Sequence, residues 1–141
     1  IIEEGYRKAR KYHGSFTVVI QSDLDMLKFG GVGKVIYGNS EFKFKLESPD
    51  YEQARKEGIL DYDDFTMRVL KSVKSNKPKY SEIFIDSKTL GMGVVRLCVD
   101  SYSYFVYTSE AKEYMEIERI VEQKGVSYAE AIEEMVSRVN S

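Results

Sequence analysis

The sequence predicts a mixed α/β fold, and three patterns support that prediction. Phe16–Ile20 is a nearly continuous apolar run, broken only by Thr17, which is typical of a strand covered on both faces. Glu41–Leu46 alternates apolar residues with lysines, which is typical of a half-exposed strand. Ser127–Glu130 has the Ser-x-x-Glu spacing of a helix capping box. Strands and helices are therefore both expected.

Composition sets limits on the kind of protein. A length of 141 residues fits one domain, and the formal net charge of −2 gives no general attraction to nucleic acid. No apolar run is long enough to span a bilayer, and no signal peptide is visible. The single cysteine, Cys98, fits a reducing compartment. We therefore expect a soluble, cytoplasmic protein.

The first forty residues predict a helix, a strand and a glycine-rich break. Residues 1–12 have a helical pattern, and Gly14 is expected to end that helix in the left-handed conformation. The strand Phe16–Ile20 follows, and a short helix begins at Asp23. Glycines at 30, 31, 33 and 38 then interrupt the pattern.

The glycine-rich segment does not form a Walker A loop. That motif needs a glycine five positions before its Gly-Lys pair and Ser or Thr directly after it. Lys28 and Val35 occupy those positions around Gly33-Lys34. We therefore reject a phosphate-binding loop here.

The middle of the chain predicts one strand and two helices. The strand is Glu41–Leu46, and a short helix follows Ser48-Pro49 and ends at Gly58. The second helix covers about 61–74 and carries an apolar stripe of Phe65, Val69, Leu70 and Val73. The helix dipole favours the acidic residues at its start, and the spacing of these acids matches no calcium-binding loop.

The carboxyl half predicts three strands followed by a pair of helices. The strands are Ser81–Asp86, Gly93–Val99 and Tyr102–Thr108, with the last two expected to form an antiparallel hairpin. The helices run to Lys124 and from Ser127 onward.

Three residues near the start are the candidate functional side chains. Gln21 ends the predicted strand Phe16–Ile20, and open α/β sheets bind ligands at the carboxyl ends of their strands. Arg10 lies eleven positions before Gln21, and Arg7 lies one helical turn before Arg10. The sequence therefore predicts a site formed by Arg7, Arg10 and Gln21.

The segment Gly5–Ser22, GYRKARKYHGSFTVVIQS, resembles the region after the Walker B strand in conjugative type IV secretion ATPases of the TraC kind. The Arg-to-Gln spacing is the most specific part of the resemblance. It continues through Gly38-Asn39-Ser40, VRLCVDSYSYFVYTS (95–109) and KGVSYAEAI (124–132). The resemblance therefore covers most of the chain.

The resemblance implies a partial RecA-like sheet with flanking helices, an antiparallel hairpin and a C-terminal helix pair. Gln21 would be the sensor of the ATP γ-phosphate. Arg10, with Arg7 as second choice, would be the arginine finger that reaches a neighbouring subunit's nucleotide. The longer protein would bind ATP and Mg²⁺, form a ring and meet other type IV secretion components. It would work in the bacterial cytoplasm, at the inner face of the inner membrane.

The chain lacks the Walker A and Walker B segments of that family and opens at Ile1-Ile2. We therefore expect residues 1–141 to be one domain, a C-terminal fragment of a motor domain that holds no cofactor and hydrolyses no ATP alone. The strand Phe16–Ile20 would then have an unpaired edge, which predicts self-association or domain swapping.

Two other functions are open at this point. A complete, non-enzymatic α/β interaction module would use the tyrosine-rich strand 102–108 and the C-terminal helices. A single-strand nucleic-acid binder would use the basic segment Lys71–Lys79, although no aromatic ladder accompanies it.

Overall fold

The computed structural model describes residues 4, 5 and 8–140, and it divides into two compact units. The first comprises Ile1–Ser75 and Glu82–Arg96, and the second Asn76–Ser81 and Leu97–Ser141. The fold is mixed α/β with a small antiparallel sheet of four strands and a C-terminal helix pair, as the sequence predicts.

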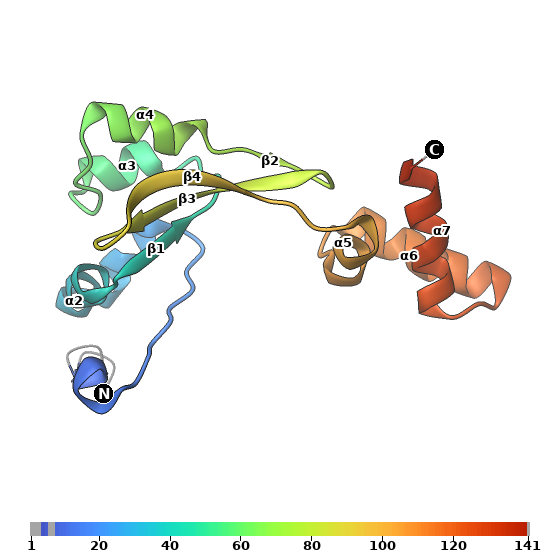
Figure 1. Ribbon diagram of the computed structural model, residues 1–141, viewed down its shortest axis with the longest axis horizontal. Coiled ribbons are helices and arrows are strands. Elements are labelled where there is room, and N and C mark those ends of the chain that lie inside the picture. The colour runs from blue at the N-terminus through green and yellow to red at the C-terminus, as the bar shows by residue number, and fades with distance from the viewer. Residues whose placement is uncertain (1–3, 6–7, 141) are drawn as a thin grey trace. The chain divides into compact units, whose positions relative to one another are not determined.

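The elements follow one another along the chain as Figure 1 labels them. In chain order they are η1 (Ala9–Tyr12), η2 (Asp23–Phe29), α2 (Gly31–Asn39), β1 (Phe42–Lys45), α3 (Tyr51–Lys56), α4 (Asp64–Ser72), β2 (Ser75–Asn76), β3 (Tyr80–Ser87), β4 (Gly91–Leu97), α5 (Ser101–Tyr107), α6 (Ala111–Lys124) and α7 (Tyr128–Asn140).

Strand β3 is the centre of the sheet. It pairs with β1 in an antiparallel register that sets Phe44 opposite Ile85 and Lys45 opposite Phe84. It also pairs with β2 and with β4. The antiparallel hairpin therefore exists, but β3 and β4 form it, with Gly91 at a φ of 85° where the chain turns back.

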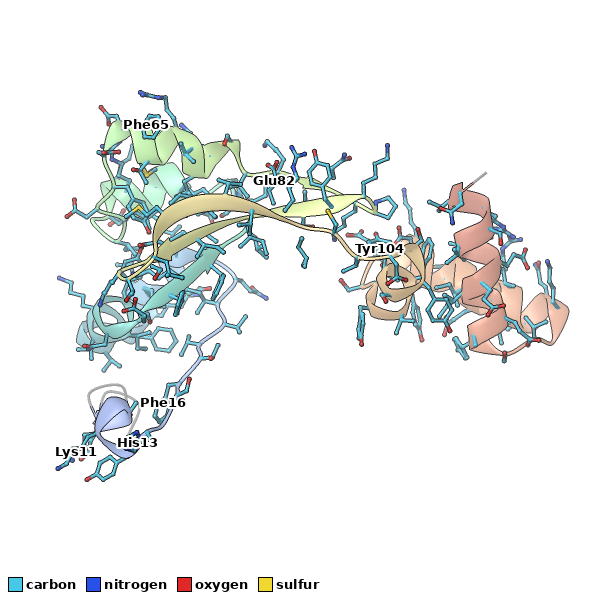
Figure 2. The ribbon with its side chains drawn as sticks, in the orientation of Figure 1. Lys11, His13, Phe16, Phe65, Glu82 and Tyr104 are labelled. Carbon is cyan, nitrogen blue, oxygen red and sulfur yellow. The ribbon has the colours of Figure 1, made fainter. Side chains whose placement is uncertain are left out.

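The core of the first unit lies between α3, α4 and β3. Its buried residues are Tyr51, Ala54, Leu60, Met67, Leu70, Val73 and Phe84. Asp63 caps α4, because its carboxylate accepts a 2.6 Å hydrogen bond from the Thr66 N–H. The predicted stripe was wrong at Phe65, whose side chain is 65% exposed (Figure 2). The helix is rotated so that Met67 faces the core instead.

Strand β1 turns its lysines inward and its aromatic residues outward. Lys45 is only 6% exposed, whereas Phe42 and Phe44 are exposed and stack on each other with ring centroids 6.1 Å apart. The pairing register explains this orientation, since it sets Lys43 opposite Asp86. On the covered face Asp86 pairs with Lys43, and Asp23 pairs with Lys45.

The prediction of a buried strand at Phe16–Ile20 was wrong. The segment from Gly14 to Ile20 has no regular secondary structure, and Val19 is 91% exposed. Within the described residues no neighbouring strand offers it backbone partners, so its strand propensity is not realised. The left-handed residue that ends η1 is His13, at a φ of 52°, and not Gly14.

The prediction of a strand at Tyr102–Thr108 was also wrong, since α5 occupies these residues. The Asp100 carboxylate accepts a 2.9 Å hydrogen bond from the Ser103 N–H, which caps the helix. Phe105 then points into a core shared with α6 and α7. Capping and burial outweigh the strand preference of tyrosine.

Two predicted caps of the C-terminal helix pair are present, whereas α6 begins after Glu110 and not at the predicted cap, Thr108 or Ser109. Gly125 ends α6 at a φ of 64°, and its N–H donates to the Val121 carbonyl over 2.9 Å. Ser127 and Glu130 form the capping box of α7, with the Ser127 N–H donating to the Glu130 carboxylate over 2.9 Å. No helix in the described part of the chain is long and apolar enough to cross a bilayer.

Replacing Leu70 tests the position of the first unit's core. Leu70 is fully buried, so we expect Leu70→Ala to lower the free energy of unfolding by about 2–5 kcal/mol in urea titrations. Phe65→Ala, on the same helix, is the matched control and should change it by about 0.5 kcal/mol or less. A large loss in Phe65→Ala would contradict the observed rotation of α4.

Candidate functional site

Gln21 lies exposed at the boundary between the extended segment and η2. The next residue, Ser22, is fixed in place. Its hydroxyl accepts a hydrogen bond from the Leu24 N–H over 3.2 Å and donates one to the Asp50 carboxylate over 2.6 Å. The Asp25 carboxylate completes the capping box by accepting from the Ser22 N–H over 3.2 Å. The backbone is therefore anchored directly after Gln21.

A buried ion pair fixes Asp23, the residue after Ser22. Asp23 pairs with Lys45 of β1, and the two side chains are 11% and 6% exposed. Burial lowers the pKa of the Lys45 ammonium, while the charge and hydrogen bond of Asp23 oppose that change. The pair ties the start of η2 to the sheet.

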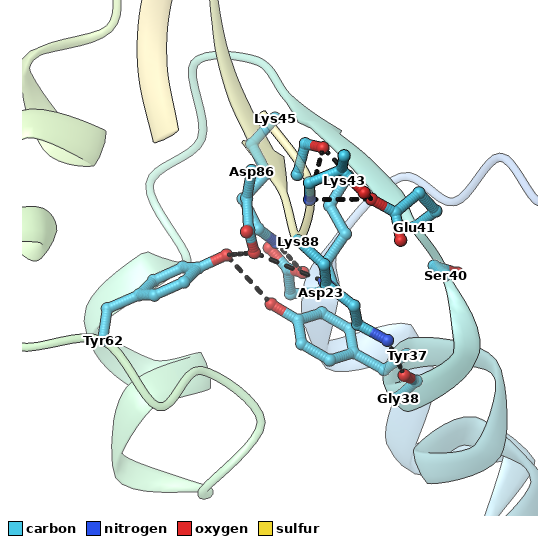
Figure 3. Close-up of polar contacts among 12 residues, drawn as sticks. Asp23, Tyr37, Gly38, Ser40, Glu41, Lys43, Lys45, Tyr62, Asp86 and Lys88 are labelled. Atoms are coloured by element: carbon cyan, nitrogen blue, oxygen red, sulfur yellow. Dashed lines mark hydrogen bonds and ion pairs between the residues drawn. The ribbon is translucent and has the colours of Figure 1, made fainter. Parts of the chain in front are cut away.

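A second pair lies beside the first on the covered face of the sheet. Lys43 and Asp86 are 3.3 Å apart, and the Tyr62 hydroxyl donates a 2.6 Å hydrogen bond to the same Asp86 oxygen (Figure 3). The Tyr37 and Tyr62 hydroxyls are 3.3 Å apart. Both lysine ammonium groups lie near the face of the Tyr37 ring, at 5.0 and 5.3 Å from its centroid.

We call Asp23, Tyr37, Lys43, Lys45, Tyr62 and Asp86 the ionic cluster. It has two cations and two anions, and each has an opposite charge within bonding distance. Burial raises the pKa of Tyr37 to about 12 and, with the bond to Asp86, raises that of Tyr62 as well. Both hydroxyls therefore stay protonated near neutral pH. The cluster is a scaffold that positions its neighbours.

A further set of contacts closes the turn between β3 and β4 onto β1. The Glu41 carboxylate accepts hydrogen bonds from the Thr89 hydroxyl and N–H over 2.6 and 2.9 Å. These bonds lower the pKa of Glu41. Lys88 donates to the Gly38 carbonyl at the end of α2 (Figure 3).

Of the two candidate arginines, the structure describes only Arg10. Arg10 lies within η1, whereas Arg7 lies outside the described residues. Between η1 and Gln21 the chain is irregular from His13 to Ile20. A joint site of Arg7, Arg10 and Gln21 stays a prediction.

The basic segment Lys71–Lys79 is largely neutralised by glutamates. Lys71 pairs with Glu52 over 2.5 Å and Lys74 with Glu47 over 2.9 Å. In the second unit, Lys77 pairs with Glu110 over 2.7 Å. Ammonium groups engaged in this way have less to offer phosphates, which weakens the nucleic-acid hypothesis.

The second unit contains a hollow of about 300 Å³. Its walls include Tyr80, Tyr104, Tyr107, Leu97 and Val99. The Tyr104 hydroxyl is turned toward Glu113, to which it donates over 3.0 Å. Among the described residues, no three His, Cys, Asp or Glu side chains are grouped so that they could hold a metal ion.

Comparison with known families decides the relationship of the chain. The family model of the TraG P-loop domain matches residues 2–139. The chain belongs to the TraG P-loop domain family. This membership ties it to conjugative transfer and to the P-loop ATPases of that process. No curated protein and no solved structure is significantly similar to the chain. The narrower resemblance to TraC stays a prediction.

Sequence reasoning proposed Gln21 as a candidate but did not find the ionic cluster, whose Asp23 anchors the chain two residues later. The only local indication of the cluster was the alternation of Phe and Lys in FKFK (42–45). That pattern is equally consistent with a strand whose lysines face solvent. The acids that hold these lysines, Asp23 and Asp86, lie far away in the sequence. Only the folded register brings them together.

Breaking one partner of the buried pair tests the scaffold. Asp23→Asn leaves the Lys45 charge uncompensated, so we expect a loss of about 3–5 kcal/mol in the free energy of unfolding. The double variant Asp23→Asn/Lys45→Met removes both charges and should regain most of that stability.

The exposed pair Lys28–Asp25 supplies the control. Lys28 is 79% exposed, and Lys28→Met should change stability by about 1 kcal/mol at most. Equal effects of Asp23→Asn and Lys28→Met would mean that the Asp23–Lys45 pair is not buried in solution.

Proposed function

We propose that this chain supplies the sensor glutamine and the arginine finger of a TraC-like conjugative-transfer ATPase. The observation that carries the proposal is the anchoring of Gln21. In a member of the TraG P-loop domain family, an exposed glutamine directly precedes two residues fixed by Asp50 and by the buried Lys45.

Glutamine suits the role of a γ-phosphate sensor. Its amide both donates and accepts hydrogen bonds, so it can contact a phosphate oxygen and orient the attacking water. Such a group acts only if its position is fixed before the reaction. The capping box at Ser22 and the Asp23–Lys45 pair provide that support.

The arginine finger is Arg10, with Arg7 as the second choice. A guanidinium is planar and permanently charged, and it can bridge two phosphate oxygens. Lys8 is a poorer candidate because its ammonium is a point charge, and it is already paired with Glu4. A finger in this position accelerates phosphoryl transfer by about 10³–10⁵-fold.

The proposal implies a RecA-like motor in which neighbouring subunits share nucleotide sites. ATP and Mg²⁺ would be held by Walker A and Walker B segments, which these 141 residues do not contain. The motor would form a ring at the cytoplasmic face of the bacterial inner membrane and contact other type IV secretion components.

A second candidate function is a non-enzymatic interaction module. The tyrosine-lined hollow of the second unit favours it, since clefts with aromatic walls and a few hydroxyl groups are common binding sites. This function would need no Walker segments.

Substitutions in an assembled motor test the sensor and the finger. In a protein that carries these residues together with a Walker A and B pair, Gln21→Ala should lower kcat by about 10²–10³-fold with little change in KM. Arg10→Ala should lower it by about 10³-fold or more. Lys11→Ala is the matched control and should keep kcat within about twofold. A Gln21→Ala motor as active as the parent would overturn the sensor assignment.

The chain alone should be inactive. With no phosphate-binding loop to hold MgATP, the purified 141-residue polypeptide should release phosphate no faster than buffer does. Turnover above that background, retained after repurification, would contradict this expectation.

A further inference from the structure

Asp50 occupies the N-cap position of α3 without capping that helix. An aspartate at this position normally accepts a hydrogen bond from an N–H group in the first turn of its helix. Among the residues that the structure describes, the Asp50 side chain makes no such bond to α3, and its backbone is helical, with φ at −88° and ψ at −2°. The carboxylate instead accepts a 2.6 Å hydrogen bond from the hydroxyl of Ser22, 28 residues earlier in the chain.

The backbone of Asp50 is held firmly on both sides. Its N–H donates to the Ser48 hydroxyl over 3.2 Å, and its carbonyl accepts from the Ala54 N–H over 2.8 Å. The helix that it begins is packed into the core of the first unit, where Tyr51 is 4% and Ala54 is 0% exposed. The carboxylate therefore projects from a fixed element, as the support of a functional residue requires.

The Ser22 hydroxyl passes this support to the backbone that follows Gln21. The same oxygen accepts a 3.2 Å hydrogen bond from the Leu24 N–H. Donation to a carboxylate polarises a hydroxyl and makes its oxygen a better acceptor, so the two bonds strengthen each other. Because Gln21 and Ser22 share a peptide bond, the Asp50 carboxylate limits where the glutamine backbone can lie.

We propose that Asp50 is a positioning residue for the sensor glutamine and that it couples Gln21 to α3. The inference rests on the proposed function, since Asp50 touches no nucleotide and acts only through Gln21. The Asp23–Lys45 pair ties the chain to the sheet, whereas Asp50 ties it to a helix. A movement of α3 would therefore displace Gln21, which provides a route for regulating the nucleotide site.

Amide hydrogen exchange in the full chain tests the support in the absence of nucleotide. Asp50→Ala removes the acceptor of the Ser22 hydroxyl, so exchange at Leu24 and Asp25 should accelerate about tenfold or more, because hydrogen bonds to charged groups are the strong ones. Exchange at Ala54 in α3 should accelerate by a smaller factor. Asp50→Asn keeps a carbonyl oxygen at the same place and should restore most of the protection.

Asp64→Ala is the matched control. Asp64 is also an acid in the first turn of a helix of this unit, but it is 78% exposed and pairs with Arg55 over 2.7 Å. Its replacement should leave exchange at Leu24 within about twofold of the parent chain. A larger acceleration at Ala54 than at Leu24 in Asp50→Ala would mean that Asp50 caps α3 in solution, and it would overturn the inference.

Kinetics of an assembled motor test the role in catalysis. In a protein that carries these residues together with a Walker A and B pair, Asp50→Ala should lower kcat about tenfold or more with little change in KM, because positioning acts on the transition state. Asp50→Asn should recover kcat to within about threefold. The double variant Gln21→Ala/Asp50→Ala should be no slower than Gln21→Ala, since Asp50 acts through Gln21.

The outcomes distinguish this inference from the proposed function. If Gln21→Ala lowers kcat and Asp50→Ala does not, the inference is wrong and the sensor assignment stands. If Asp50→Ala slows the Gln21→Ala motor by the same factor as it slows the parent, Asp50 acts independently of Gln21, and the inference is again wrong. If Gln21→Ala is as active as the parent, the proposed function fails and the positioning role fails with it.

Discussion

The buried pair of Asp23 and Lys45 is the interaction on which the first unit depends. A buried charge is costly unless an opposite charge and hydrogen bonds accompany it. Lys45 is 6% exposed, so the chain must bring Asp23 to it. That requirement fixes the start of η2 against β1. It also decides which face of β1 is covered, because Lys43 turns to the same side and meets Asp86.

This constraint has two consequences for the surface. The aromatic side chains of β1 are left facing outward, with Phe44 65% exposed. The anchored Ser22 and Asp23 also define where the irregular segment before them ends, and so they leave Gln21 exposed at a fixed point. An exposed polar residue held from behind by a rigid scaffold is how functional side chains are usually presented.

The sequence predicted well those elements whose determinants are local. The capping box at Ser127 and the left-handed Gly125 bound their helices as expected, since caps act within a few residues. Strand β1 was predicted from its alternating pattern, but not which of its faces is covered. That depends on Asp23 and Asp86, which pair with its lysines and are distant in sequence. Phe16–Ile20 was misjudged because a strand needs a neighbour, and propensity alone does not supply one.

The same contrast between local and long-range determinants applies to the candidate functional residues. Gln21 was chosen from its spacing to Arg10 and from the family resemblance, and its role stays a proposal. Membership of the TraG P-loop domain family shows only the link to conjugative transfer. The tyrosine-rich segment 102–108 looked like a strand, but the Asp100 cap and the burial of Phe105 make it a helix. Tyr104 and Tyr107 of this segment line a hollow in the second unit instead.

Amide hydrogen exchange at Leu24 and Asp25 tests the anchoring most directly. Their N–H groups donate to the Ser22 hydroxyl and carbonyl, so they report on the segment that follows Gln21. If the buried pair holds this segment, Lys45→Met should accelerate exchange at both amides by about tenfold or more, and by a larger factor than at Leu70 in α4. Unchanged exchange at Leu24 and Asp25 in Lys45→Met would show that the ion pair does not position Gln21.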